Sequence, residues 1–176
     1  MATLEYDGRV EIKNLTRIQG SDESLSLKIG ERRGKESSFS LGVSPDQKFI
    51  CGYHGFLLAD KFWLRLKILE ISETSVKERA KFEEKSDLGP VLQVRFFKNF
   101  GEKYVLVVFR HLGIYCKEFV VIGELFVFHS SEGTIQKMKN KSINFGETDS
   151  LVVEMVGSQC FVLDNELSLY KVWVNT

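Results

Sequence analysis

Two cysteine-histidine pairs are the residues of this 176-residue chain whose types and spacing come closest to a metal site. Cys51-x-x-His54 is followed by His111-x-x-x-x-Cys116, and thiolate and imidazole are ligands that tetrahedral zinc prefers. Neither pair lies in a glycine-rich knuckle, and the second spacing is loose. We therefore expect no metal site and no cofactor, with buried thiols and partly exposed imidazoles.

Cys51, His54 and Asp60 also supply the thiol, base and carboxylate that a cysteine hydrolase needs. They lack the strand-turn-helix setting in which hydrolase motifs present a nucleophile, so Cys51 is interpreted as a small core residue. The acidic pairs Asp22-Glu23 and Glu83-Glu84 fall in polar turns or on solvated faces. Glycine-rich phosphate-binding motifs do not occur in the sequence. We predict that the chain is not an enzyme.

Aromatic and basic residues provide the remaining candidates for a binding surface. Aromatic rings close to lysines are the composition of a stacking platform for single-stranded nucleic acid, but the RNA-binding consensus is absent. We interpret most of these rings as core and most of these lysines as a solvated rim. The candidate binding residues are Trp63, Phe97, Phe100, Tyr104 and Trp173, and the candidate basic patch is Lys137, Lys139 and Lys141.

Alternation of apolar and polar side chains with a period of two dominates the chain and predicts β-strands. The first two alternating runs, 24–29 and 38–43, flank a charged segment and are expected to form a hairpin. A turn is predicted at Ser44-Pro45-Asp46-Gln47, before a strand that starts near Phe49. The run 62–71 carries apolar groups on both faces, which indicates a central strand.

Residues 72–87 allow two interpretations. Ser75-Val76-Lys77-Glu78 has the spacing of a helix capping box, which would begin a short helix. Val76, Ala80 and Phe82, however, do not share a helical face and alternate with charged residues. The alternation favours a charged edge strand, which discourages edge-to-edge aggregation.

After Pro90 the apolar density rises and further strands follow. Gly157-Ser158 fits a two-residue hairpin turn, so the last three strands are expected to form a meander. About ten to thirteen short strands, with turns about every 8 to 12 residues, predict an all-β fold. We expect one antiparallel β-sandwich or jelly-roll-like domain over residues 1–176, with at most one short helix and with a barrel left open.

Composition limits the partners and the compartment. An apolar share of 43% and fourteen Phe residues provide enough material for one filled core. The 24 basic and 24 acidic residues cancel, which disfavours nucleic acid and anionic membranes as partners. No apolar run reaches the length of a membrane span, and Met1 to Asp7 lack the pattern of a signal peptide. We expect the cytosol or nucleus, where the three cysteines, Cys160 included, stay reduced.

Together these patterns favour a non-enzymatic interaction or assembly module. Sandwiches have edge strands that pair with other strands, and Phe, Trp and Tyr are frequent interface anchors. We expect a protein partner in a homo- or hetero-oligomer, bound through an edge strand or an aromatic surface patch. The alternatives are a domain that binds a small lipid or carbohydrate ligand and a weak binder of single-stranded nucleic acid.

Overall fold

The computed structural model describes residues 2–4, 9–12, 25–28, 38–59, 61–72, 75–89, 91–111, 120–147, 151–156, 159–164 and 169–172. In some of these segments it describes the backbone alone. The described residues form fourteen strands and no helix, so the predicted all-β antiparallel sandwich is confirmed, with slightly more strands than expected. The strands are β1 (Ala2–Leu4), β2 (Arg9–Ile12), β3 (Leu25–Lys28), β4 (Ser38–Val43), β5 (Phe49–Leu58), β6 (Lys61–Ile71), β7 (Val76–Ser86), β8 (Val91–Phe100), β9 (Lys103–His111), β10 (Val120–His129), β11 (Thr134–Glu147), β12 (Leu151–Val156), β13 (Gln159–Asp164) and β14 (Leu169–Val172).

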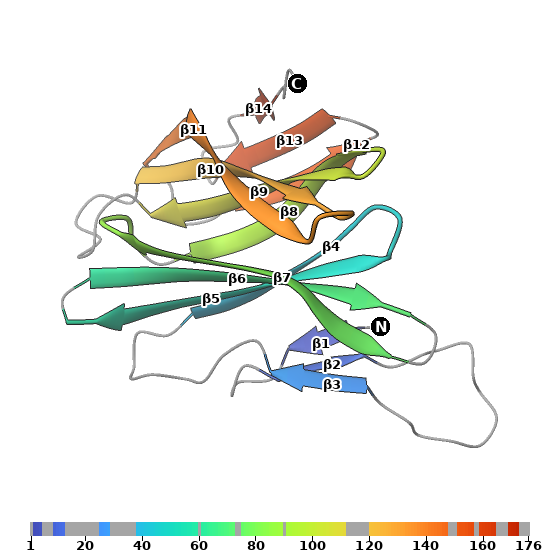
Figure 1. Ribbon diagram of the computed structural model, residues 1–176. Helices are drawn as coiled ribbons and strands as arrows, with labels where there is room; N and C mark the ends of the chain where they lie inside the picture. The colour runs from blue at the N-terminus through green and yellow to red at the C-terminus, as the bar shows by residue number, and fades with distance from the viewer. Residues whose placement is uncertain are drawn as a thin grey trace.

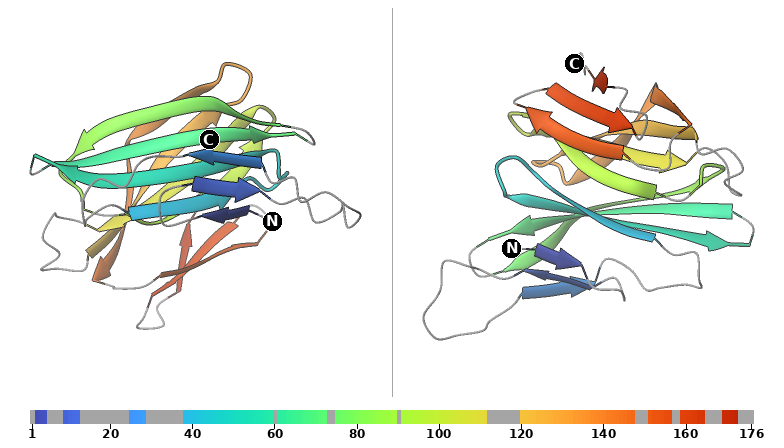
Figure 2. Two further views of the ribbon diagram at one scale, coloured as in Figure 1. Left: turned by 90° about the horizontal axis from the view of Figure 1, so that it is seen from below. Right: turned by 180° about the vertical axis from the view of Figure 1, so that it is seen from behind.

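The strands form four antiparallel sheets that stack in layers. The two inner sheets have four strands each, in the orders β4-β5-β6-β7 and β11-β10-β9-β8. The two outer sheets have three strands each, in the orders β1-β2-β3 and β12-β13-β14. Figures 1 and 2 show the β1–β3 sheet outside the first inner sheet and the β12–β14 sheet outside the second.

The main core lies between the two inner sheets, because alternate residues of each strand face it. Aromatic rings fill much of this space: the Phe49 ring meets the rings of Tyr104 and Phe128 edge to face, with centroids 5.0 and 5.1 Å away. Each such side chain contributes roughly 1.5 to 3 kcal/mol when fully buried. The core residues are Phe49, Cys51, Tyr53, Leu64, Leu66, Ile68, Ala80, Val94, Phe96, Tyr104, Leu106, Val108, Phe126 and Phe128.

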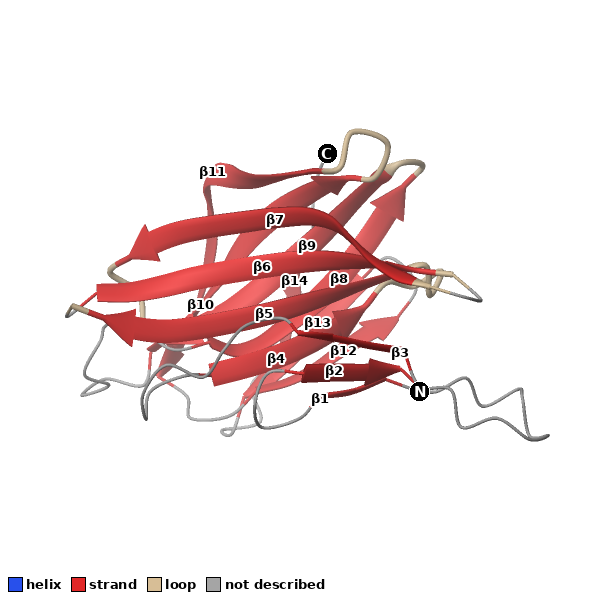
Figure 3. Cartoon of the chain, turned by 60° about the horizontal axis from the view of Figure 1, so that its bottom comes forward, coloured by secondary structure: helices blue, strands red, loops and turns tan. Residues whose placement is uncertain are grey.

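Both long sides of this sandwich are closed by contacts between the inner sheets. On one side β4 approaches β8 so closely that a Cβ atom on Gly42 would lie 2.9 Å from the Val94 carbonyl oxygen. On the other side Arg79 of β7 donates hydrogen bonds from Nε and Nη2 to the Ser130 carbonyl, at 3.3 and 3.1 Å. Figure 3 looks onto β5 to β7, with strands of the second inner sheet crossing behind them.

The predicted turn between β4 and β5 is confirmed, and a core residue anchors it. Asp46 accepts hydrogen bonds from the Ser44 hydroxyl at 2.7 Å and from the Lys48 amide at 3.3 Å. The buried Tyr104 hydroxyl donates to the same carboxylate at 2.7 Å. Partial burial alone would raise the pKa of Asp46, but the hydrogen bonds from Ser44 and Tyr104 outweigh it and lower that pKa.

The structure confirms two further expectations and contradicts one. The edge-strand interpretation of 72–87 is confirmed, because β7 pairs with β6 at the end of its sheet, and the meander at the end of the chain is confirmed as β12 to β14. The expected hairpin of 24–29 with 38–43 is wrong: β3 pairs with β2, and β4 pairs with β5 through the tight turn at Ser44. Within the described residues, no helix has the length and apolarity needed to span a bilayer.

Candidate functional site

Cys51 and His54 belong to the same strand but point to opposite faces of its sheet. Cys51 lies in the inner core with no solvent exposure, and burial raises the pKa of its thiol, which keeps it protonated. The His54 ring stacks on Phe39 with centroids 4.5 Å apart and lies 4.7 Å from the ring of Phe56. The two side chains therefore cannot ligate one metal ion or form a thiol-imidazole pair.

The other residues of the zinc and hydrolase hypotheses do not complete a site. Cys116 and Asp60 lie outside the described residues, and the Cys160 side chain does as well. His111 is buried at the end of β9, and burial lowers its pKa. Among the residues that the structure describes, no group of three or more His, Cys, Asp or Glu side chains is arranged to hold a metal ion.

The aromatic binding candidates are distributed over different parts of the fold. Tyr104 is 4% exposed, so its ring belongs to the core rather than to a surface patch. Phe97 and Phe100 belong to β8, but their side chains lie outside the described part of the chain, as does Trp173. Trp63 is half-buried on the outer face of the first inner sheet. The five predicted residues therefore do not form one described patch.

Trp63 is part of a row of flat side chains on β5 and β6. Its ring is parallel to that of its cross-strand partner Phe56, with centroids 6.4 Å apart. The Arg65 guanidinium lies 5.4 Å from the centroid of the Phe56 ring and forms a 3.0 Å ion pair with Glu83 of β7. Hydrogen bonds from Arg65 and then Lys81 lower the pKa of Glu83 to about 2. The ring contacts of Phe56 with Trp63 and Arg65, together with the ion pair of Arg65 with Glu83, fix these side chains in place.

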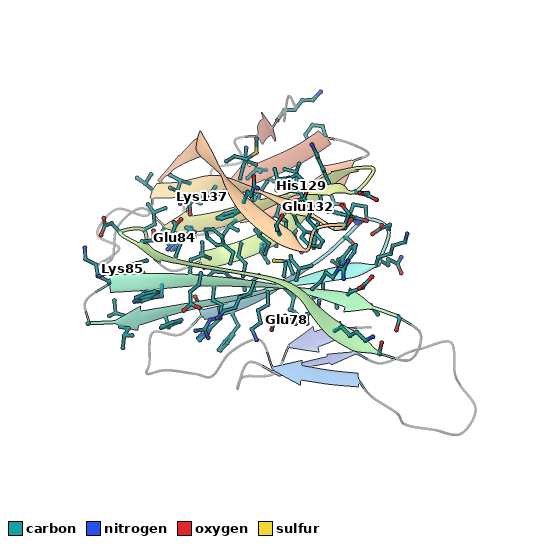
Figure 4. All side chains as sticks on the ribbon, viewed as in Figure 1. Glu78, Glu84, Lys85, His129, Glu132 and Lys137 are labelled. Atoms are coloured by element: carbon teal, nitrogen blue, oxygen red, sulfur yellow. The ribbon has the colours of Figure 1, made fainter. Side chains whose placement is uncertain are left out.

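The predicted basic patch is part of β11, and its first lysine faces the interior. Lys137 is opposite Phe126, whose ring lies in the core, so Lys137 points between the inner sheets. Its ammonium group pairs with Glu124 at 2.6 Å and with Glu84 of β7. Burial alone would lower the pKa of Lys137, but the two carboxylates outweigh it and raise that pKa. Figure 4 shows Lys137 and Glu84 on facing strands.

Lys139 and Lys141 belong to the same strand, but their side chains lie outside the described part of the chain. The Lys137 charge is compensated by two carboxylates, so this residue does not act as a free surface cation.

Arg110 completes a cluster of two buried and two half-buried charges that the sequence interpretation missed. Its side chain has no solvent exposure, and Nη1 pairs with Glu124 at 3.1 Å. The remaining donors also have protein acceptors, namely the carbonyls of Leu88 and Gly89 and the Ser86 hydroxyl. Two cations and two carboxylates, from β7, β9, β10 and β11, thus form one neutral network.

A sequence signal for this cluster exists. Glu124 interrupts the apolar run of β10, and Arg110 follows directly after the apolar run of β9. A charge within a strand that is covered on both faces requires a partner, because an isolated buried charge costs several kcal/mol. Each guanidinium nitrogen of Arg110 has a protein acceptor, which indicates that the cluster joins strands rather than receiving a ligand.

The outward side of the β12–β14 sheet presents apolar side chains to solvent. Val152 of β12 is 64% exposed, the most exposed large apolar side chain among the described residues. Its cross-strand partner is Leu163, and the next pair on this side joins Glu154 to Phe161. Val162, between these positions, is fully buried on the opposite side. We call Val152, Glu154, Phe161, Leu163 and Lys171 the β12–β14 outer face.

Comparison of the chain with protein-family models and with curated proteins finds no match.

Proposed function

We propose that this protein is a non-enzymatic interaction module that binds a protein partner through the β12–β14 outer face. The observation that carries the proposal is the 64% exposure of Val152 on the outermost sheet. A lone exposed valine is ordinary, but here it adjoins the half-buried Leu163 and Phe161 on the same side of the sheet. Together they make a contiguous apolar surface.

The arrangement of this face has the features of a protein interface. An apolar centre with charged residues at its margin is the usual pattern, and Phe161 provides an aromatic anchor. Glu154 and Lys171 lie on the first and third strands, on either side of Phe161, and the Lys171 ammonium extends over the Phe161 ring. Covering Val152 alone would contribute roughly 1 to 2 kcal/mol.

The thiol and the basic groups that could support catalysis are buried or paired within the chain, which supports an interaction role over a catalytic one. The Cys51 thiol is buried and kept protonated, whereas nucleophilic catalysis requires a thiolate. Arg110 and Lys137 are neutralised by carboxylates of the same chain. These side chains serve packing and the joining of strands.

Affinity capture with matched variants tests the proposal. The bait is the full chain, compared with Val152→Glu and with Val43→Glu, which places the same charge at a 49% exposed valine of β4. A charge in the interface should abolish binding, whereas the charge on β4 should not. We expect bound proteins, further copies of the chain included, to be retained by the wild type and by Val43→Glu and lost by Val152→Glu. Equal retention by all three baits would refute the proposal.

A further inference from the structure

We infer that the partner at the β12–β14 outer face is a second copy of this chain, packed face to face about a two-fold axis that runs along β13. This inference rests on the proposed function, since it names the occupant of the same surface. Its basis is the register of the three strands and the sign of the charges that the register places at the two margins.

The strand register arranges the outer face in two rows across the sheet. Val152 is opposite Leu163, which forms an apolar row. Glu154 is opposite Phe161, and Phe161 is opposite Lys171, which forms a row with an acid, an aromatic ring and a base. The Lys171 ammonium also lies 5.7 Å from the centroid of the Phe161 ring. The base is thus held over the middle of the face rather than directed away from it.

A two-fold axis parallel to β13, in the plane between two copies, exchanges the margins of the sheet. It places β12 of one copy over β14 of the other, while positions along the strands stay in step. Glu154 then opposes Lys171 of the partner subunit, and the same pair recurs on the other side of the axis. Leu163 meets its own counterpart, and each Phe161 ring lies beneath the Lys171 ammonium of its own subunit, which the carboxylate of the other subunit approaches.

Such a surface is self-complementary, which is the condition for an isologous dimer. Sheets that pack face to face align within roughly 30° because of their twist, so the rows stay close enough for these contacts. Among the described side chains of this face, each copy contributes one acid and one base, so these charges balance. Lys171 retains its contact with Phe161 while the carboxylate approaches from the other subunit.

Pairing of two β12 edges is the competing arrangement. It would extend the sheet through backbone hydrogen bonds and leave the outer face in solvent. Lys171 lies on β14, two strands away from that edge, and would not take part. Charge reversal at Lys171 therefore separates the two arrangements.

Sedimentation equilibrium of the full chain over micromolar to near-millimolar concentrations tests the inference. We expect a monomer-dimer equilibrium whose Kd rises at least about fivefold with Glu154→Lys and with Lys171→Glu, because each creates two like-charge contacts. The double reversal restores opposite charges and should return the Kd to within about threefold of the wild type. Glu132→Lys makes the same charge change on the exposed turn between β10 and β11 and should leave the Kd unchanged.

The outcomes separate this inference from the proposed function. A wild-type chain that stays monomeric at the highest concentration, or a dimer that ignores Lys171→Glu, would overturn the face-to-face dimer. The proposed function would then still be decided by capture with Val152→Glu. Circular dichroism and melting of each variant confirm that the fold is intact, as expected for substitutions of exposed residues.

Discussion

Arg110 and Glu124 illustrate why charged side chains in a β-sandwich core need several partners at once. The guanidinium group is bound by one carboxylate, one hydroxyl and two carbonyls, and the carboxylate is shared with Lys137. Such a network gives each guanidinium nitrogen an acceptor, so the desolvation cost is offset by interactions inside the protein. Removing Arg110 or Glu124 leaves the other charged and buried.

We expect Glu124→Gln and Arg110→Met each to lower the free energy of unfolding by about 3 to 5 kcal/mol. The double variant Arg110→Met/Glu124→Gln should lose less than the sum of the two, because neither of these two buried charges remains without its partner and Lys137 keeps its ion pair with Glu84. Urea denaturation at pH 7 measures all three. Glu83→Gln, which breaks an ion pair on the surface, is the control and should cost less than about 1 kcal/mol. Similar losses for Glu124→Gln and Glu83→Gln would contradict this account.

Glu83 predicts a pH dependence of stability. Its folded pKa of about 2 is below the ordinary value of 4.5, because Arg65 and then Lys81 bind the ionised carboxylate. A depressed folded pKa means that the unfolded chain takes up the proton first as the pH falls. The stabilisation by Glu83 is therefore complete above about pH 4.5 and is lost between about pH 4.5 and 2.

Denaturation of the wild type and Glu83→Gln between pH 7 and 2 checks this dependence. The difference in unfolding free energy should be small at pH 7, because surface pairs are screened, and should vanish towards pH 2. Glu132→Gln is the matched control, since that carboxylate accepts a hydrogen bond from the neutral Thr134 hydroxyl. A difference for Glu83→Gln that grows as the pH falls would have the wrong sign.

A strand could be predicted from the sequence where its own pattern of apolar and polar residues shows which face is buried. A strand could not be predicted where its buried face depends on partners from other strands. The alternation in β7 and the apolar run in β6 identified both strands from the sequence. The first half of β11 carries lysines that resemble a solvated surface, so its pattern does not identify an inner strand. The register places Lys137 opposite Phe126, and Glu124 and Glu84 from other strands compensate its charge there. The charge cluster of Arg110, Glu124, Lys137 and Glu84 could not be predicted from the sequence for the same reason.

The sequence also does not show where one strand closely approaches a turn, as β7 does at Gly133. It has φ of +66° in the turn between β10 and β11, and an added Cβ would lie 2.8 Å from the Arg79 carbonyl oxygen of β7. Gly101 has a similar φ of +60°, but a Cβ there would meet nothing within 4 Å. Both glycines have a positive φ, but only Gly133 has a neighbouring backbone atom close enough to contact an added Cβ.

Alanine at these two positions separates backbone strain from steric contact. Gly101→Ala should cost about 1 kcal/mol for the left-handed conformation alone. Gly133→Ala should cost a further 1 to 2 kcal/mol, roughly, because β7 must move away from the turn. Chemical denaturation of the two variants under identical conditions gives the comparison. Equal losses would show that the approach of Arg79 to the turn is not constrained.

The stack of four sheets is a property of the whole chain that alternation alone could not predict. Alternation shows that a strand has an inner and an outer side, but β5, β9 and β10 are buried on both. Continuous apolar runs indicated covering on two faces without revealing what covers them. The layers follow from short peripheral strands that add one three-stranded sheet outside each inner sheet.

This layering predicts unequal stability across the molecule. β5, β6, β9 and β10 have a hydrogen-bonded neighbour on both sides and supply much of the core, so their amides should exchange only through global unfolding. β12, β13 and β14 have six residues or fewer, and Val152 is 64% exposed. We expect their amides to exchange through local opening, with a free energy at least about 2 kcal/mol lower. Native-state hydrogen exchange at increasing denaturant measures both values. Exchange of β13 with the same free energy and denaturant dependence as β6 would instead mean that the outer sheet unfolds together with the core.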